Sequence, residues 1–313
     1  MPLDPRAKRF LDMTAVMPAA TAARPPLAER RKALEKLMQF ARADRVCNTG
    51  VDGYFDLADR RIAYRLYAPT TAGAAALPGI VFFHGGGMVA GSIATHDLVA
   101  RALAEEAGCR LLSIGYRLAP EHPFPAAVDD AIEAIRATVA HGQSFGIDPA
   151  TIAVCGDSAG ATLTAVVCQQ QRQRALPAIS LQCLICPVLD FGEESVSRRV
   201  FAQGYLIDRP TLEADLADYL PGKLDRSDPL VSPLRATALA GLPPAIIHTA
   251  EFDPLRDEGN TYAARLSTAG VAVEHTCHDG MPHNFHALGA VLPQGRTVLK
   301  QIGTQIARAL GVK

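Results

Sequence analysis

Apolar runs of strand length alternate with helix-length segments along most of the chain, a pattern typical of a mainly parallel α/β sheet. The predicted strands are 61–69, 79–85, 110–117, 151–157, 179–188, 244–251 and 271–277. The last five are rich in β-branched and aliphatic residues with little alternation, as expected for strands covered by helices on both faces. Helices are predicted at 97–107, 126–140 and 255–269.

Two segments lie outside this repeating pattern. Residues 27–43 predict a helix with an apolar face, and 191–230 is polar, rich in proline and glycine, with a short helix near 211–220. Both are additions that could form a cap over one end of the sheet. The apolar face of the first helix carries Leu34, Leu37, Met38 and Ala41, and its basic residues are Arg30, Arg31, Lys32 and Lys36. We interpret the basic residues as a solvated face in preference to a membrane-surface helix.

Composition narrows the function classes. Hydrophobic residues make up 49% of the 313, and 31 basic against 32 acidic residues give a net charge of -1. The charge provides no electrostatic basis for binding nucleic acid. The most apolar stretch, 178–191, is too short to span a bilayer, and the N-terminus lacks the apolar core of a secretory signal. Seven scattered cysteines, an odd number, favour a reduced, cytoplasmic setting.

The sharpest local motif is Gly-Asp-Ser-Ala-Gly at 156–160, a G-x-S-x-G pentapeptide between a predicted strand and a predicted helix. Small neighbours allow the strained turn that presents a nucleophilic serine, here Ser158. The serine would lie at a helix N-terminus, where the dipole favours negative charge. The alternative is a tight turn with an ordinary capping serine.

The sequence His-Gly-Gly-Gly at 84–87 follows the strand 79–85. Glycines let backbone amides approach the oxygen that becomes anionic during acyl transfer. We therefore expect an oxyanion hole formed by the amides of Gly86, Gly87 and Ala159, with His84 as a structural brace of the loop. A phosphate-binding loop is the alternative, but no Gly-Lys-Ser/Thr follows.

A serine nucleophile needs a base and an acid, which hydrolases place on loops after late strands. The loop after 244–251 predicts Asp253 as the acid, since Glu251 still belongs to the strand end and Asp257 to the next helix. For the base, His283 follows a glycine and precedes a helical run, and His286 is the fallback.

The same C-terminal region offers an alternative metal site. Its ligand types are His275, Cys277, His278, His283 and His286, with Cys183 and Cys186 as a further pair. The two cysteines of that pair, predicted to point to opposite faces of one strand, would chelate poorly. We therefore expect no metal.

Together these motifs resemble the bacterial hormone-sensitive-lipase-like family of carboxylesterases. The resemblance covers about residues 81–285 and rests on 84–87, 116–131, 156–160, 251–259 and 283–285. It implies the α/β-hydrolase fold, a mainly parallel central sheet with helices on both faces and a helical cap. Residues 1–45 would supply the N-terminal part of the cap, and 46–313 the catalytic domain with a cap insertion at about 191–230.

The resemblance further implies a Ser158, Asp253, His283 triad that hydrolyses short- to medium-chain esters through an acyl-enzyme, without a cofactor. Ala161 and Cys186 depart from common family residues, which leaves the pocket shape and substrate preference open. Glu121 and Asp157 match family positions and are expected to stabilise loops.

Two rival functions remain at this stage. The first is amide hydrolysis or deacetylation on the same triad, and the second is a non-catalytic ligand-binding protein that keeps the fold. The expected partner is a small-molecule ester, and a homodimer is left open.

Overall fold

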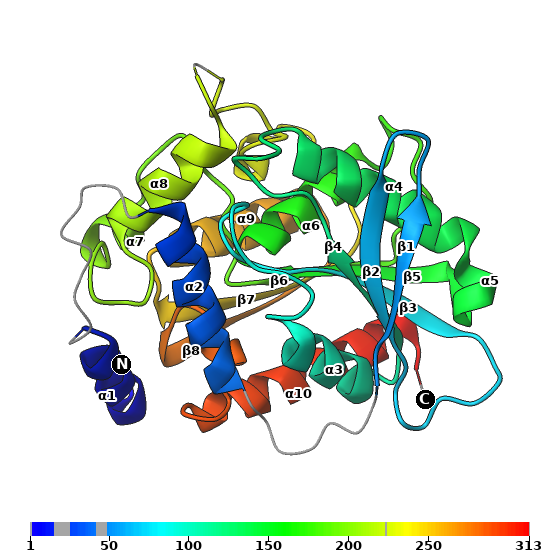
Figure 1. The fold of residues 1–313 in the computed structure, drawn as a ribbon, viewed down its shortest axis with the longest axis horizontal. Helices are drawn as coiled ribbons and strands as arrows, with labels where there is room; N and C mark the ends of the chain where they lie inside the picture. Colours follow the sequence, from blue (N-terminus) through cyan, green and yellow to red (C-terminus); the bar gives the residue numbers. More distant parts are fainter. Residues whose placement is uncertain (1, 16–25, 42–48, 223, 313) are drawn as a thin grey trace.

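The computed structural model describes residues 2–15, 26–41, 49–222 and 224–312. These residues form one eight-stranded sheet in the order β1-β2-β4-β3-β5-β6-β7-β8 (Figure 1). The strands are β1 (Val51–Asp56), β2 (Arg61–Tyr67), β3 (Leu77–Phe83), β4 (Arg110–Gly115), β5 (Ile147–Asp157), β6 (Leu181–Ile185), β7 (Ala245–Phe252) and β8 (Val273–Pro282). The β1–β2 and β2–β4 pairs are antiparallel and the remaining pairs are parallel, which confirms the mainly parallel sheet.

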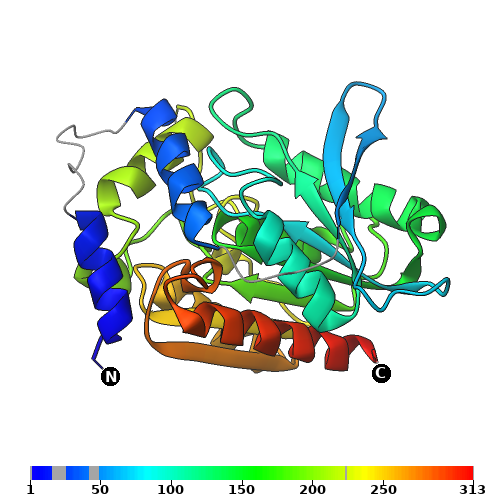
Figure 2. The same ribbon diagram turned by 60° about the horizontal axis from the view of Figure 1, so that its bottom comes forward.

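Helices cover both faces of the sheet, as predicted. Helices α3 (Asp97–Ala107) and α10 (Pro293–Leu310) lie on one face, and α4 (Ala126–Ala140), α6 (Ala159–Gln170) and α9 (Arg256–Thr268) lie on the other (Figures 1 and 2). Alternate residues of β3 point to opposite faces. Ile80 and Phe82 therefore join the apolar cluster of α3 and α10, whereas Val81 and Phe83 join that of α4 and α6.

The remaining helical segments are short or lie at the ends of the sheet. They are α1 (Pro5–Ala15), α2 (Leu27–Met38), η1 (Gln39–Ala41), α5 (Gly142–Phe145), α7 (Val196–Val200), α8 (Arg209–Tyr219), η2 (Pro233–Arg235) and η3 (Phe285–Ala287). The predicted helices at 27–43 and 211–220 correspond to α2 with η1 and to α8. Residues 42 and 43 of the first prediction lie outside the described residues.

Helices α2 and α8 lie side by side near the end of the sheet toward which β6, β7 and β8 point (Figure 1). Arg30 of α2 pairs with Asp215 and Asp218, which share one face of α8. The prediction of a solvated basic face is therefore wrong for Arg30, which is buried. A charged side chain tolerates such burial when carboxylates pair with it.

Strand boundaries differ from the predictions at several points. Strand β6 ends at Ile185, so Cys186 follows the strand and does not lie within it, with a left-handed φ of 45°. Strand β8 runs beyond the predicted end at 277 to Pro282, so His283 is the first residue after the strand. Strand β1 and helix α10 had no counterpart among the predicted elements.

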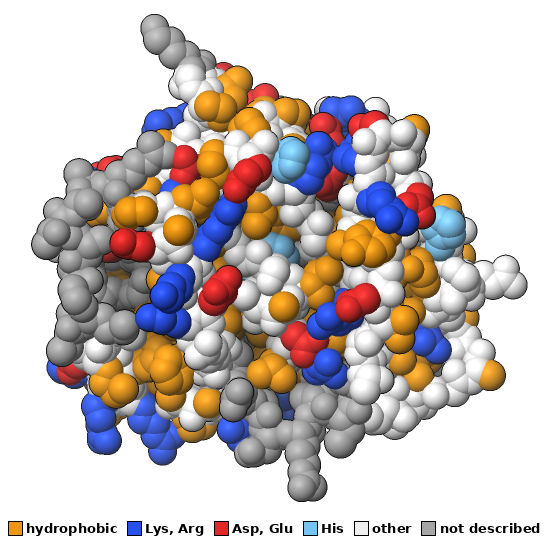
Figure 3. Space-filling view, viewed as in Figure 1, with side chains coloured by type: hydrophobic (Ala, Val, Ile, Leu, Met, Phe, Trp, Pro, Cys, Tyr) orange, Lys and Arg blue, Asp and Glu red, His pale blue; other side chains and the backbone are white. Residues whose placement is uncertain are grey.

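No helix among the described residues is long and apolar enough to cross a membrane. On the face drawn in Figure 3, basic and acidic side chains are interspersed. This mixture agrees with the nearly balanced charge of the sequence.

Candidate active site

Ser158 occupies the sharp turn between β5 and α6. Its backbone has a positive φ of 51° with ψ −116°, a conformation that costs energy for a residue with a side chain. The turn is possible because its neighbours are small. A methyl group at Gly156 would overlap the backbone of Gly160, and one at Gly160 would overlap the carbonyl of Phe83. The motif 156–160 therefore fits the strained strand-to-helix turn predicted for it.

The structure brings Ser158, His283 and Asp253 together from three different elements. His283 Nε2 lies 3.1 Å from Ser158 Oγ, and His283 Nδ1 lies 2.8 Å from Asp253 Oδ2. Ser158 follows β5, Asp253 follows β7 and His283 follows β8, so all three lie at the carboxyl ends of parallel strands. The arrangement allows the ring to take a proton from the hydroxyl while the carboxylate holds the opposite ring nitrogen.

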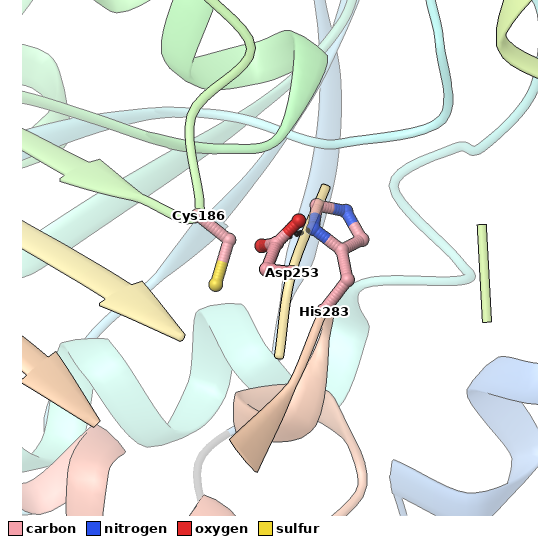
Figure 4. A group of neighbouring side chains, drawn as sticks. All are labelled: Cys186, Asp253 and His283. Carbon is pink, nitrogen blue, oxygen red and sulfur yellow. Dashed lines mark hydrogen bonds and ion pairs between the residues drawn. The ribbon is translucent and has the colours of Figure 1, made fainter. Parts of the chain in front are cut away.

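Asp253 and His283 are both buried. Asp253 is 0% exposed and His283 1% exposed. The second oxygen of Asp253, Oδ1, accepts a hydrogen bond of 2.8 Å from the Leu255 amide, which fixes the carboxylate plane. Figure 4 shows the carboxylate directed at the His283 ring. Of the other acids weighed for this role, Glu251 accepts a hydrogen bond from the Gly280 amide and Asp257 one from Ser197.

The fallback base, His286, lies elsewhere. It sits in the single-turn helix η3, and its Nε2 is 3.6 Å from Asp157 Oδ2, too long for a hydrogen bond but within ion-pair distance when the ring is charged. His275 lies in β8, as predicted, with its Nε2 3.1 Å from Thr249 Oγ1. Of these three histidines, His283 is the one within hydrogen-bond distance of Ser158.

The glycine loop after β3 has the geometry of a donor loop. Gly86 and Gly87 have φ values of 127° and 64°, which favour glycine, and both are partly exposed. Among the described residues, neither amide donates a hydrogen bond to another protein group. Ala159, the third predicted donor, is the first residue of α6 beside Ser158. The amide at a helix N-terminus has no acceptor within the helix.

The Asp157 side chain connects the turn at Ser158 to the glycine loop at 84–87. Its Oδ1 accepts a 3.0 Å hydrogen bond from the Gly85 amide, and its Oδ2 lies 3.3 Å from His96 Nε2. Burial by itself opposes ionisation, yet the neighbouring His96 and His286 hold the pKa of this carboxyl well below its usual range. The loop-stabilising role expected for Asp157 matches these contacts, because a buried carboxylate fixes the loop relative to the serine.

His84 is buried and makes structural contacts. Its Nδ1 lies 2.9 Å from the Gly85 carbonyl, and its ring stacks on Tyr116 with 4.4 Å between the ring centres. Burial lowers the pKa of His84 to about 3, so the ring is neutral at physiological pH. A neutral, stacked ring suits the brace predicted for this position.

The described residues contain one group with metal-ligand spacing: Cys186, Asp253 and His283 (Figure 4). Burial and the nearby Asp253 charge raise the pKa of the Cys186 thiol well above its usual range. A cysteine binds a metal ion as its thiolate, which the raised pKa disfavours, and the Asp253 carboxylate and His283 ring already contact each other. The donor chemistry therefore fits a metal poorly. The predicted alternative set of ligands at 275–286 is not brought together as a metal-binding group among the described residues.

Two neighbours of the site were not anticipated from sequence. His96 contacts the Asp157 carboxylate, although it lies in the segment before α3 where a lone histidine gives no functional signal. Cys186 lies within 4.8 Å of the acid and base. Its position was flagged as a departure from a family pattern, but its contact with Asp253 depends on where β6 ends.

The comparison with protein families matches residues 80–287 to a family described by its alpha/beta hydrolase fold. Among curated proteins, the carboxylic ester hydrolase LipN of Mycobacterium tuberculosis (strain ATCC 25618 / H37Rv) is 44% identical over 72% of this chain, with 61% of its own length covered. The carboxylesterase NlhH of Mycobacterium tuberculosis is 38% identical over 93% of this chain and 91% of its own. The ethyl acetate hydrolase of Pseudomonas putida is 40% identical over 72% of this chain and 70% of its own length.

Solved structures agree along the whole chain. An ester hydrolase, EH1AB1, from the metagenome of Lake Arreo superimposes with a TM-score of 0.94 at 39% identity, covering 100% of both chains. It was solved as a complex with a derivative of bipyridine phosphonate. A thermostable esterase from Pseudomonas putida ECU1011 gives a TM-score of 0.94 at 29% identity, covering 100% of this chain and 99% of its own.

Proposed function

The chain belongs to the α/β-hydrolase fold family and is a carboxylic ester hydrolase, and from this premise we propose that it works as a serine esterase with Ser158, His283 and Asp253 as its triad. The observation that carries the proposal is the continuous contact from the Ser158 hydroxyl through the His283 ring to the Asp253 carboxylate. The family predicted from the sequence motifs, the bacterial hormone-sensitive-lipase-like esterases, is confirmed.

In the proposed mechanism, Ser158 Oγ attacks the ester carbonyl carbon while its proton passes to His283 Nε2. Asp253 holds Nδ1 and stabilises the charged ring. The tetrahedral oxyanion accepts hydrogen bonds from the amides of Gly86, Gly87 and Ala159. The carbon–oxygen bond to the alcohol then breaks, and the alcohol leaves with the proton from Nε2. An acyl group remains on Ser158.

Water completes the cycle by the same steps. His283 takes a proton from water, whose oxygen attacks the acyl carbon, and the carboxylic acid leaves as Ser158 regains its proton. Each oxyanion donor is typically worth about 3 kcal/mol of the barrier. The positive end of the α6 dipole adds to the same effect.

The proposed substrates are carboxylic esters with short to medium acyl chains. Support comes from the relative in Pseudomonas putida, which is an ethyl acetate hydrolase. Amide hydrolysis on the same triad would need protonation of a poorer leaving group, and no observation favours it. A purely binding role would not require a base and acid in contact with the serine, so the triad geometry counts against it.

We also propose that the described parts of residues 1–45 and of about 191–230 form a cap over the site, with 46–313 as the catalytic domain; residues 1, 16–25, 42–45 and 223 of the two cap ranges lie outside the described residues. The supporting contact is between α2 and α8, joined by Arg30 with Asp215 and Asp218. A methyl group at Gly87 would overlap the Asp215 carboxylate, so α8 lies against the glycine loop. Cap residues therefore border the space where the acyl or alcohol group binds.

The Ser158→Ala variant tests the proposal. We expect hydrolysis of p-nitrophenyl butyrate to fall by at least about 10³-fold, because the nucleophile is lost while the fold persists. Thermal unfolding of the variant controls for folding. A p-nitrophenyl phosphonate should label Ser158 in the wild type, mapped by mass spectrometry of peptides. Near-normal turnover in the variant, or labelling at another residue, would contradict the assignment.

A second measurement separates esters from amides. A series of p-nitrophenyl esters from acetate to dodecanoate, beside the p-nitroanilide of butyric acid, should give the highest kcat/KM at a short or medium chain. Preference for the anilide would favour the amidase alternative.

A further inference from the structure

Arg31, on the N-terminal helix α2, lies against the turn that follows the glycine loop. Its Nε donates a 2.8 Å hydrogen bond to the Val89 carbonyl, and its Nη2 lies 3.2 Å from the Ala119 carbonyl. Both acceptors are backbone oxygens that lie far from α2 in the sequence. Helix α2 is therefore joined to the catalytic domain by hydrogen bonds to backbone carbonyls of that domain, and not only by apolar packing.

The carbonyl that Arg31 holds belongs to a turn closed on Gly86. The amides of Val89 and Ala90 donate to the Gly86 carbonyl at 3.1 and 2.9 Å. The carbonyl of Gly86 thus points into the turn, and the Gly87 N–H of the same planar trans peptide points the opposite way. A displacement of Val89 would rotate this peptide and with it the Gly87 amide, a proposed oxyanion donor.

A second contact places α2 on the same loop. Leu34 lies one turn beyond Arg31, and a methyl group added at Gly86 would come 3.0 Å from its side chain. The Ala119 amide also donates a 2.9 Å hydrogen bond to the Met88 carbonyl. The turn 86–90 therefore lies between α2 and the segment around Ala119. Arg31 hydrogen-bonds to a carbonyl of the turn and to a carbonyl of that segment.

Glu121 fixes the guanidinium itself. Its two oxygens accept hydrogen bonds of 2.8 and 2.7 Å from Nη1 and Nη2 of Arg31, a bidentate geometry. The hydrogen bonds from Arg31 lower the pKa of Glu121 to about 2, so the carboxylate is charged at physiological pH. The pair is 31% and 53% exposed, so its own ionic attraction contributes little to stability.

We propose that Arg31 is a positioning residue for ester hydrolysis: by holding the Val89 and Ala119 carbonyls it keeps the amides of Gly86 and Gly87 aimed at the reacting carbonyl oxygen. This inference rests on the proposed function. It assigns part of the oxyanion machinery to the N-terminal segment. Arg31 touches no reacting atom and acts through the backbone.

The test compares Arg31→Met with Lys32→Met, an exposed cation on the same helix. We expect Arg31→Met to lower kcat for p-nitrophenyl butyrate by about 10- to 100-fold, as for a misaligned donor and less than the roughly 10²- to 10³-fold for a donor removed outright, with KM changed by less than about threefold. Lys32→Met should match the wild type. A KM effect alone, or an unchanged kcat, would overturn the proposal.

A trifluoromethyl ketone supplies a readout that a purely structural role would not move. Its serine adduct carries an oxyanion, so its inhibition constant should rise in Arg31→Met by the same factor by which kcat falls. The inhibition constant of butyrate, which forms no such adduct, should stay within about threefold. Equal weakening of both inhibitors would indicate a general loss of the pocket and would refute the positioning role.

Two further variants keep the test decisive if Arg31→Met folds poorly. Arg31→Lys retains the charge but cannot reach both carbonyls and Glu121, so an intermediate loss of kcat is expected. Glu121→Gln leaves the bonds to Val89 and Ala119 and should cost less than Arg31→Lys; the reverse order would contradict the proposal. Phosphonate labelling of Ser158 in every variant tests the triad separately, since labelling at Ser158 with unchanged kcat would sink this inference alone.

Discussion

At the scale of residues, the Asp157 carboxylate connects the turn that carries Ser158 to the glycine loop at 84–87. Its oxygens contact the Gly85 amide and the His96 ring, while its own backbone leads directly into Ser158. The side chain is 1% exposed, so its charge is compensated by these neighbours and not by water. Arg31 hydrogen-bonds to the Val89 carbonyl in the turn that follows the glycine loop. One carboxylate and one guanidinium therefore contact the backbone of the segment 85–89.

Asp157→Asn tests this coupling with little change in shape. The amide oxygen can still accept from Gly85, but the neutral group no longer attracts His96 and His286. We expect kcat to fall about tenfold with KM little changed, because the loop loses part of its alignment with Ser158. Steady-state kinetics with p-nitrophenyl butyrate measure the effect, with Asp59→Asn, an exposed acid, as the control. A rise in KM without a loss of kcat would argue against coupling.

The contact of Ser158, His283 and Asp253 could be predicted because each residue has a local signature: a G-x-S-x-G turn for the serine, and loops after late strands for the other two. The residues that contact their neighbouring loops could not be predicted. His96 and Arg31 are ordinary residue types in ordinary positions, and only the fold brings them to Asp157 and Val89. Similarly, Arg30 meets Asp215 across 185 residues, a separation that no local pattern reports.

At the scale of elements, the central strands were predictable because they are buried on both faces and therefore read as continuous apolar runs. Strand β1 was missed because it lies at the sheet edge, where Val51 and Tyr54 are exposed and Phe55 alone is buried. Helix α10 did carry a signal: Val298, Ile302, Ile306 and Leu310 recur at helical spacing and are buried.

The pairing of α2 with α8 gives an element-scale prediction. Arg30→Met should lower the free energy of unfolding by about 3–5 kcal/mol, because the partly buried Asp215 and Asp218 would lose the guanidinium that pairs with both, and Asp215 would take up a proton or stay charged beside Asp218. Lys32→Met removes an exposed charge from the same helix and should change it by less than about 0.5 kcal/mol. Urea denaturation at pH 8 measures both. Equal stability of the two variants would show that the buried pair contributes nothing.

At the scale of the whole molecule, three buried or partly buried histidines have pKa values that burial shifts downward. Burial lowers the pKa of His84 and His248 to about 3 and that of His278 to about 4. Unfolding returns each ring to a pKa near 6.5, so the unfolded chain binds more protons between these values. The stability that these groups contribute is present above pH 6.5 and is lost as the pH falls toward their folded pKa values of about 3 to 4. Asp215 acts in the opposite direction, because burial raises its pKa to about 7.

His248 allows this balance to be tested at one site. Its Nδ1 lies 2.8 Å from His278 Nε2 and its Nε2 lies 2.9 Å from Gln305 Oε1, and both partners are partly buried. His248→Phe removes the titrating ring, so its structural cost should not depend on pH. Between pH 7 and pH 5 the wild type should lose about 2 kcal/mol more unfolding free energy than the variant, the value for one proton taken up only on unfolding. Urea denaturation of both proteins at the two pH values measures this difference. Parallel losses in the two proteins would mean that His248 binds its proton equally well folded and unfolded, and burial would then not control its charge.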